Sequence, residues 1–238
     1  MQTFSAANKI GDIVAQFPKA SAIFKKYHVD FCCGGDRPLG QAINEQNINE
    51  SELLTELNKA YQESQKIHDT QIDWRTAPFS ELVDYIVNKH HAYLHNNLPA
   101  LSALTTTVLR AHGTNHKELA RVHKLFNLLK LDLEQHLIKE EQEVFPKIQE
   151  YEKDGNIKNL QAAVDSIEEL ENEHEGAGDI LKELRSITNN FQLPQDACGT
   201  YERTYKIMQE LESDLFEHIH LENNILHPRL KQKLNGYN

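Results

Sequence analysis

Hydrophobic positions recur at steps of three and four residues over four long stretches of the chain, the period of an amphipathic α-helix. The stretches cover residues 80 to about 109, 122–144, about 157–191 and 201–226. Short polar segments join them, and Pro194 interrupts the chain before the last one. The pattern predicts an all-α protein whose main part is an antiparallel four-helix bundle.

Histidine and glutamate side chains stand on the faces that these helices would turn inward. Two stretches contain the same pattern, His-x-x-x-Glu, whose spacing puts both side chains on one helical face, one turn apart. The other two stretches each carry a histidine on the apolar face. Polar groups in an apolar core are unfavourable unless something compensates them, and a metal ion does so. The candidate ligands are His91, His136 with Glu140, His174, and His218 with Glu222.

Four imidazoles and two carboxylates are too many ligands for one tetrahedral zinc ion, and they do not form the all-oxygen cage of calcium or magnesium. Two metal ions could share them, with Glu140 and Glu222 bridging both ions and two histidines on each. An oxide or hydroxide bridge would leave one position for a small molecule. The ligand types suit two iron ions, although zinc, manganese and copper stay open. A lone histidine on an apolar face is usually a core residue, but four ligand-bearing helices favour the metal.

A small helical domain is predicted at residues 1–65, before the bundle at 78–238. Its apolar positions indicate short helices near residues 10–17, 21–27, 39–43 and 52–61. Segments this short bury little surface, so the domain is expected to depend on the bundle or on a second subunit for stability. The polar stretch at residues 63–70 is the predicted linker.

The adjacent Cys32 and Cys33 precede Gly34 and Gly35, which permit positive φ or a close approach of another group. A disulfide between neighbours would be strained and easily reduced. We therefore interpret the two cysteines as a redox-active or metal-relaying pair, the catalytic candidates of the chain. The alternative is a pair of small, partly buried residues in a tight turn. Cys198 stands alone in the sequence, and a structural role is expected for it.

Other polar residues adjoin the candidate ligands. Four histidines lie off the predicted ligand faces and are expected to be exposed or to lie beside the ligands: His90, His95, His220 and His227. Glu141, Glu173 and Glu175 follow or flank ligands. A carboxylate in such a place can orient a metal-bound imidazole, but surface acids are the commoner explanation in so acidic a chain.

The composition limits the partners. Lys and Arg number 25 against 36 Asp and Glu, a formal net charge of −11, so nucleic acid and anionic membranes are disfavoured. No segment has the apolar length needed to span a bilayer, and the start of the sequence lacks the features of a signal peptide. Three cysteines do not make a secreted disulfide framework. A cytoplasmic location is expected.

Several motifs together resemble those of a known family. They are Asp-Phe-Cys-Cys-Gly-Gly at 30–35, Asp-Trp-Arg at 73–75, His-Leu-Ile-Lys-Glu-Glu at 136–141, Glu-His-Glu at 173–175, and Glu-His-Ile-His-Leu-Glu-Asn at 217–223. The chain resembles, over almost its whole length, the hemerythrin-like di-iron proteins that repair iron–sulfur clusters. The family's ligand positions fall on the same six residues that the helix faces select. A further family histidine is equivalent to His112, which we expect near the site without being a ligand.

The resemblance implies a function. The protein would repair iron–sulfur clusters damaged by oxidative or nitrosative stress, by donating iron or by removing nitric oxide. Damaged iron–sulfur proteins and nitric oxide or oxygen would be its partners, and a homodimer is expected. The residues alone leave two alternatives open, a nitric oxide or oxygen sensor or carrier, and a nitric oxide reductase. Ferritin-like storage is disfavoured, because ferritin sites are richer in carboxylates and use Glu-x-x-His.

Overall fold

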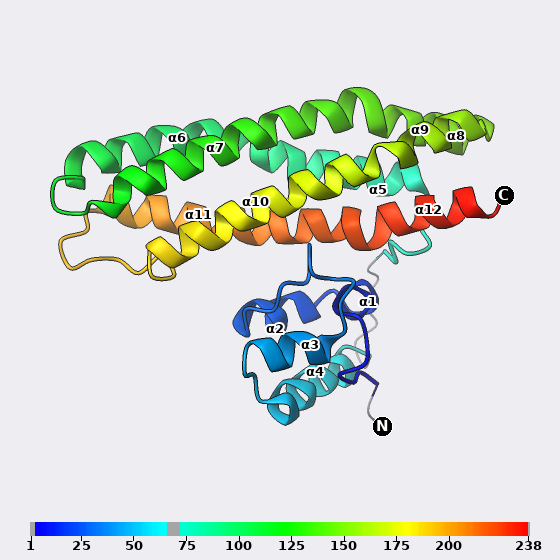
Figure 1. Ribbon diagram of the computed structural model, residues 1–238, viewed down its shortest axis with the longest axis horizontal. Coiled ribbons are helices and arrows are strands. Elements are labelled where there is room, and N and C mark those ends of the chain that lie inside the picture. Colours follow the sequence, from blue (N-terminus) through cyan, green and yellow to red (C-terminus); the bar gives the residue numbers. More distant parts are fainter. Residues whose placement is uncertain (1–2, 66–71, 238) are drawn as a thin grey trace. The chain divides into compact units, whose positions relative to one another are not determined.

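A computed structural model describes residues 3–65 and 72–237 (Figure 1). The regular structure of these residues is helical, apart from one isolated bridge between Lys9 and Pro38. The prediction of an all-α fold is confirmed. Within the described part, none of the helices has both the length and the apolar character needed to cross a membrane. Of the predicted linker, Glu63 and Ser64 close helix α4, and residues 66–70 lie outside the described residues.

The chain divides into two compact units, one formed by Met1–Leu82 with Phe216–Asn238 and the other by Val83–Leu215. The boundary between Leu215 and Phe216 falls inside one continuous helix, α11 (Gly199–Leu221). The division therefore assigns the C-terminal helical residues to the same unit as the N-terminal segment. The predicted domain boundaries, 1–65 and 78–238, stay a prediction.

Short helices build the N-terminal part of the first unit, as predicted. They are α1 (Ile10–Gln16), α2 (Ala20–Lys26), α3 (Leu39–Glu45) and α4 (Glu50–Ser64). Asn49 caps α4, because its side chain accepts a hydrogen bond from the backbone N–H of Glu52. Fully buried apolar side chains from all four helices form one core, including Ile10, Phe24, Leu39 and Leu53. Phe216 packs against this core from the C-terminal segment.

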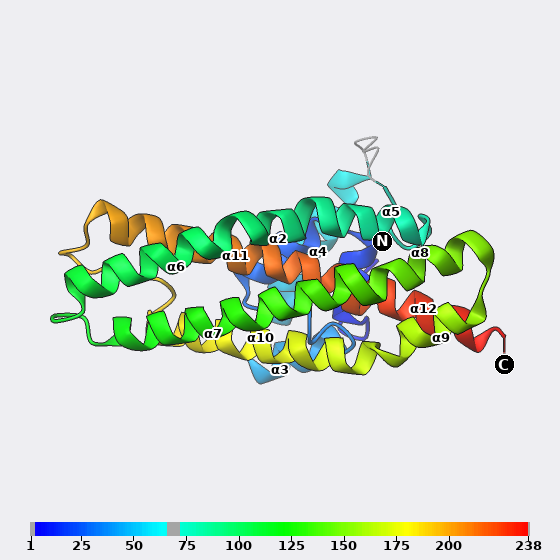
Figure 2. The ribbon, with the colours of Figure 1, turned by 90° about the horizontal axis from the view of Figure 1, so that it is seen from above.

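Four long helical segments of the second unit lie side by side as an antiparallel bundle, the last of them being the part of α11 up to Leu215 (Figures 1 and 2). They are α6 (Ala92–His112), α7 (Glu118–Lys139), α10 (Ile167–Ile187) and α11. Three shorter helices extend or connect them: α5 (Phe79–Tyr85), α8 (Phe145–Asp154) and α9 (Ile157–Asp165). The single helix predicted over 157–191 is two helices, α9 and α10, which meet at Ser166.

Three helical runs are interrupted by π-helical turns: η1 (Ile86–His91), η2 (Glu140–Val144) and η3 (Glu222–Leu226). Each turn begins or ends at a candidate ligand. Proline explains two of them, since its nitrogen cannot donate the next hydrogen bond and its ring displaces the carbonyl four residues before it. Pro146 follows η2, and Pro228 follows η3 before helix α12 (His227–Asn235). The chain supplies no comparable cause for η1.

Candidate metal centre

The six candidate ligands come from the long helical runs, at or beside the π-helical turns and in α10. His91 closes η1, His136 lies near the end of α7, Glu140 opens η2, and His174 lies in α10. His218 lies near the end of α11, and Glu222 opens η3. All six are buried, and none is more than 4% exposed. Two carboxylates at this depth need a compensating positive charge.

Distances among these side chains suit ligands that share an ion. Glu140 Oε2 lies 3.4 Å from His91 Nε2 and 3.3 Å from His136 Nε2. A charge-assisted hydrogen bond is shorter, at about 2.7–2.9 Å. Two ligands bound to one metal at about 2.1 Å each stand about 3.0–3.4 Å apart. The Nε2 atoms of His136 and His174 are 3.0 Å apart, and His218 Nε2 lies 3.0 Å from Glu222 Oε1.

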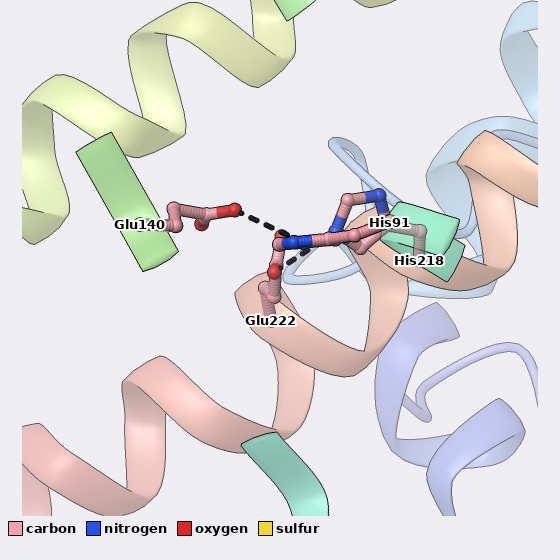
Figure 3. Close-up of side chains that lie close together, drawn as sticks. All are labelled: His91, Glu140, His218 and Glu222. Carbon is pink, nitrogen blue, oxygen red and sulfur yellow. Dashed lines mark hydrogen bonds and ion pairs between the residues drawn. The ribbon is translucent and has the colours of Figure 1, made fainter. Parts of the chain in front are cut away.

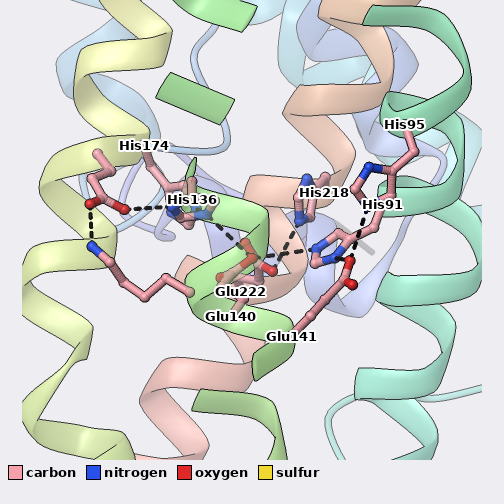
Figure 4. A network of polar contacts seen from close by, with 10 residues as sticks. His91, His95, His136, Glu140, Glu141, His174, His218 and Glu222 are labelled. Atoms are coloured by element: carbon pink, nitrogen blue, oxygen red, sulfur yellow. Dashed lines mark hydrogen bonds and ion pairs between the residues drawn. The ribbon is translucent and has the colours of Figure 1, made fainter. Parts of the chain in front are cut away.

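The ligand atoms fall into two groups in which all members lie within 4.8 Å of one another. Figure 3 shows the first group and Figure 4 the wider network. The first consists of His91, Glu140, His218 and Glu222, and the second of His136, Glu140, His174 and Glu222. Each group thus has two histidines of its own and the same two glutamates. These buried groups fit the binding of iron.

Carboxylates outside the groups orient two of the imidazoles. Glu141 Oε1 lies 2.8 Å from His91 Nδ1, and Glu173 Oε2 lies 2.7 Å from His136 Nδ1, so both Nε2 atoms face Glu140 (Figure 4). The hydrogen bond with His136, and then that with Lys139, lowers the pKa of Glu173 to about 2. Carboxylates in this position fix the ring and its tautomer at metal sites. Surface placement accounts only for the third acid, Glu175, which is exposed.

Three of the four histidines expected to be exposed or to lie beside the ligands are fully buried. His90 Nδ1 lies 3.0 Å from Asp214 Oδ1, and His220 and His227 are at most 5% exposed. The expectation assumed a regular α-helical period. His90 lies in the π-helical turn η1, where the period differs, so its side chain faces a different direction from the one expected. Burial lowers the pKa of His220 to about 4, so this ring is neutral. Only His95 is exposed, at 51%, with Nε2 3.3 Å from Glu141 Oε1.

The two N-terminal cysteines form a separate group with Asp30 in the first unit. Neither forms a disulfide, and their sulfur atoms lie 3.8 Å apart. Asp30 Oδ1 accepts hydrogen bonds from the Cys32 thiol at 3.2 Å and from the backbone N–H of Gly34 at 3.1 Å. The contact with Cys33, followed by burial, raises the pKa of Cys32 well above its usual range. Cys32 is therefore a protonated thiol at neutral pH.

Asn224 connects this cysteine turn to the helical residues that follow Glu222. Its side-chain amide donates to the carbonyl oxygens of Phe31 at 3.1 Å and Cys32 at 3.0 Å. The approach requires glycine at position 35, where a Cβ atom would stand 2.2 Å from Asn224 Oδ1. The close approach expected at the two glycines is confirmed at Gly35. Positive φ is not used there, because the one glycine with positive φ in the described part is Gly155.

His112 is not among the ligand groups of the buried centre. It ends α6, and its Nε2 lies 3.2 Å from the sulfur of Cys198, which is exposed. Because Cys198 is exposed, it is not part of the hydrophobic core. A sequence signal for the π-helical turns, by contrast, was present: both His-x-x-x-Glu pairs are followed by proline six residues after the glutamate, at Pro146 and Pro228.

Comparison with known families matches both parts of the chain. Residues 82–230 match the hemerythrin HHE cation binding domain, and residues 6–61 match a domain of unknown function, DUF542. The iron-sulfur cluster repair protein YtfE of Citrobacter koseri is 35% identical over 220 residues, which cover 92% of this chain and 94% of that protein. The YtfE proteins of Escherichia coli O81 and Escherichia fergusonii are 36% and 35% identical over the same shares.

These relatives cover both matched regions, so the likeness extends beyond the bundle. The buried histidines and glutamates lie inside the stretch that matches the cation binding domain. The cysteine pair lies inside the stretch that matches DUF542. The chain belongs to the family of hemerythrin-domain iron–sulfur cluster repair proteins.

Proposed function

We propose that this protein holds two iron ions in the buried centre and uses them to repair iron–sulfur clusters damaged by oxidative or nitrosative stress. One observation carries the proposal: both ligand groups contain two histidines and share Glu140 and Glu222. Two ions that each take two imidazoles and share two carboxylates use all six residues. Imidazole with carboxylate is a ligand set suited to iron. The relatives' printed name supports cluster repair.

The bound irons would supply a redox-active centre that can lose iron to an acceptor or bind a small diatomic molecule. The protein's own residues would determine how firmly that centre is held. Glu140 and Glu222 would link the two ions, while Glu141 and Glu173 keep the rings of His91 and His136 turned inward. Each ligand is buried, so water reaches the centre poorly and its charges interact strongly.

The cysteine pair is proposed to relay metal or electrons for the same function. Cys32 is protonated at neutral pH, so it is not a free nucleophile, and a metal ion would have to displace its proton. Asp30 offers a carboxylate beside both sulfur atoms. The double change Cys32→Ser and Cys33→Ser should leave iron loading intact and lower repair. Unchanged repair by a folded, iron-loaded variant would return the pair to a structural role.

The decisive experiment measures repair directly. A cluster enzyme inactivated by nitric oxide is incubated with the iron-loaded protein, and recovery of its activity is compared with that produced by Glu140→Gln. We expect recovery only with the unaltered protein. Iron transfer to an apo-ferredoxin, from oxidised and reduced samples in parallel, then separates donation from nitric oxide removal, with faster transfer expected after reduction because ferrous iron binds such ligands weakly.

The same experiment tests the alternatives. Equal and negligible transfer from both samples would exclude donation and favour carriage, sensing or turnover of nitric oxide. Production of nitrous oxide without repair would identify a nitric oxide reductase. A homodimer, a cytoplasmic location, and nitric oxide or oxygen as ligands stay predictions, to be checked by light scattering, cell fractionation and spectroscopic titration of the loaded protein.

A further inference from the structure

A second set of metal-ligand side chains lies in the second unit, at the end of helix α6 and in two loops, and it shares no residue with the buried centre. His112 ends α6 and His116 lies in the loop that leads to α7, while Asp196 and Cys198 lie just before α11. The loops meet at the end of the bundle where α6 ends and α11 begins (Figure 1). None of these four residues belongs to either ligand group of the buried centre.

Their separations are close to those of ligands around one ion. Sγ of Cys198 lies 3.2 Å from His112 Nε2, and Oδ1 of Asp196 lies 2.8 Å from His116 Nε2. Ligand atoms of His112, His116 and Asp196 all lie within 4.8 Å of one another; Cys198 is outside this group of three and adjoins it through its contact with His112. Around a tetrahedral zinc ion, such atoms stand about 3.3–3.6 Å apart, as the bond lengths imply. Small side-chain rotations in an exposed loop cover the difference.

One histidine also has the outer partner that metal-bound imidazoles usually have. His116 Nδ1 lies 3.4 Å from Glu118 Oε1, while its Nε2 faces Asp196. In the buried centre the corresponding carboxylates form shorter contacts, hydrogen bonds of 2.8 Å with His91 and 2.7 Å with His136. The buried ring of Tyr201 lies under both histidines, with its centroid 5.3 Å from that of His112 and 5.9 Å from that of His116. The rings therefore have a rigid surface beneath them.

The charges of the group match a divalent cation. Asp196 offers a carboxylate, and the thiol of Cys198 loses its proton when a metal ion binds it. One thiolate and one carboxylate with two imidazoles would balance an ion of charge +2. Thiolate, imidazole and carboxylate are the ligands that zinc uses.

We propose that His112, His116, Asp196 and Cys198 bind one divalent ion of the zinc class, as a second metal site of the iron-loaded protein. The proposal goes beyond the function of the buried centre and does not depend on it. Asp196 is 54% exposed and Cys198 is exposed. An ion held there is reached by water and by other molecules, so the site suits an exchangeable ion.

Cobalt(II) is the probe, because a thiolate bound to it absorbs in the near ultraviolet. The full-length, iron-loaded protein is titrated with cobalt under anaerobic conditions, and iron content is measured before and after. We expect one cobalt per chain, a thiolate-to-cobalt band, and no loss of iron. Zinc should then abolish the band by displacing cobalt, since it binds more tightly to such ligands.

Matched variants identify the ligands. Cys198→Ser should remove the band, whereas Cys32→Ser with Cys33→Ser should retain it. Asp196→Asn should weaken cobalt binding by at least about tenfold, whereas Asp179→Asn, an equal charge change at an exposed residue of α10, should leave it unchanged. Circular dichroism and iron content verify that each variant is folded.

Three results would overturn the proposal. The first is the absence of saturable cobalt binding to the unaltered protein. The second is a thiolate band that survives Cys198→Ser and disappears with the two N-terminal cysteines. The third is an equal affinity for cobalt in Asp196→Asn and Asp179→Asn.

Discussion

The buried histidine–glutamate centre and the exposed His112–Cys198 loop group use similar side chains in opposite surroundings. In the first, the candidate ligands come from helical runs, are at most 4% exposed, and include three that end or begin π-helical turns, namely His91, Glu140 and Glu222. In the second, His112 ends helix α6, the other three candidate ligands lie in loops, and Asp196 is 54% exposed. From this difference we expect residue type to select which metals can bind, and burial to set how easily an ion leaves.

The largest expected effect is the loss of iron on changing a shared glutamate. Glu140→Gln should reduce iron from about two ions per chain to about one or fewer, because both ions lose a charged ligand. Glu141→Gln should have an intermediate effect, since Glu141 orients His91. Glu143→Gln, at an exposed residue of the same segment, is the control. Iron analysis of the purified proteins checks the order, and equal losses from Glu140→Gln and Glu143→Gln would remove the contrast between the regions.

Metal removal should separate the two regions next most clearly. A chelator added to protein that carries iron in the bundle and zinc in the loops should extract zinc on the order of a hundredfold faster, because the loop ligands are exposed and the bundle ligands are not. Release of each metal is followed with a metal-specific dye. Similar rates would mean that the bundle opens as readily as a loop.

The alkylation rates of Cys198 and Cys32 give a further test of the comparison between the exposed and the buried surroundings. With chelator present, Cys198 should be alkylated on the order of tenfold faster than an unperturbed cysteine at neutral pH, since its pKa of about 7 makes about half of it thiolate. Cys32 should react far more slowly, because it is buried and its pKa is raised. Mass spectrometry of the labelled peptides measures both rates across pH.

Two treatments act as controls for that reactivity. His112→Asn should raise the pKa of Cys198 towards its ordinary value and slow its alkylation at neutral pH. Zinc should protect Cys198 in the unaltered protein. Faster alkylation of Cys32 than of Cys198 would contradict the description of Cys32 as buried with a raised pKa and of Cys198 as exposed with a lowered pKa.

The smallest expected effect concerns the stability of the metal-free protein. The folded-state pKa of Glu173 is depressed from 4.5 to about 2 by His136 and Lys139, so its contribution is present above about 4.5 and is lost as the pH falls towards 2. The side chain is 35% exposed, and solvent screening limits the contribution to below about 1 kcal/mol. Glu173→Gln should therefore lower the free energy of unfolding slightly at pH 7.

Denaturant titrations check this pH dependence, with Glu175→Gln as the exposed neighbour. The difference between Glu173→Gln and the unaltered protein should shrink by about pH 3. A difference that grew as the pH fell would contradict the sign of the pKa shift.

The helical fold and the gathering of the six buried side chains followed from sequence periodicity. His136 and Glu140, four residues apart on an apolar face, come together because the helix is regular up to that point. The burial of His90 was missed because η1 changes the helical period, and no proline stands directly after that turn as Pro146 and Pro228 do after η2 and η3. Periodicity predicts which side chains face the core of a regular helix, but it does not predict their direction where the helical period changes.

The loop group was also missed, for a different physical reason. His112 and Cys198 are 86 residues apart, and His116 and Asp196 are 80 apart. Their contacts depend on where two loops end after the bundle has packed. Spacing within one segment carries no information about such a meeting. Cys198 was therefore interpreted as an isolated residue, although its sulfur accepts bonds from His112 and from the first amides of α11.

The hydrogen bonds of Asn224 impose an order on biosynthesis. Phe31 and Asn224 are 193 residues apart, so a ribosome that adds about 5–20 residues per second needs roughly 10–40 s to pass from one to the other. Throughout that interval the cysteine turn lacks the amide that donates to the carbonyls of Phe31 and Cys32. The turn that carries the two thiols therefore gains its last two backbone partners only after residue 224 has been made.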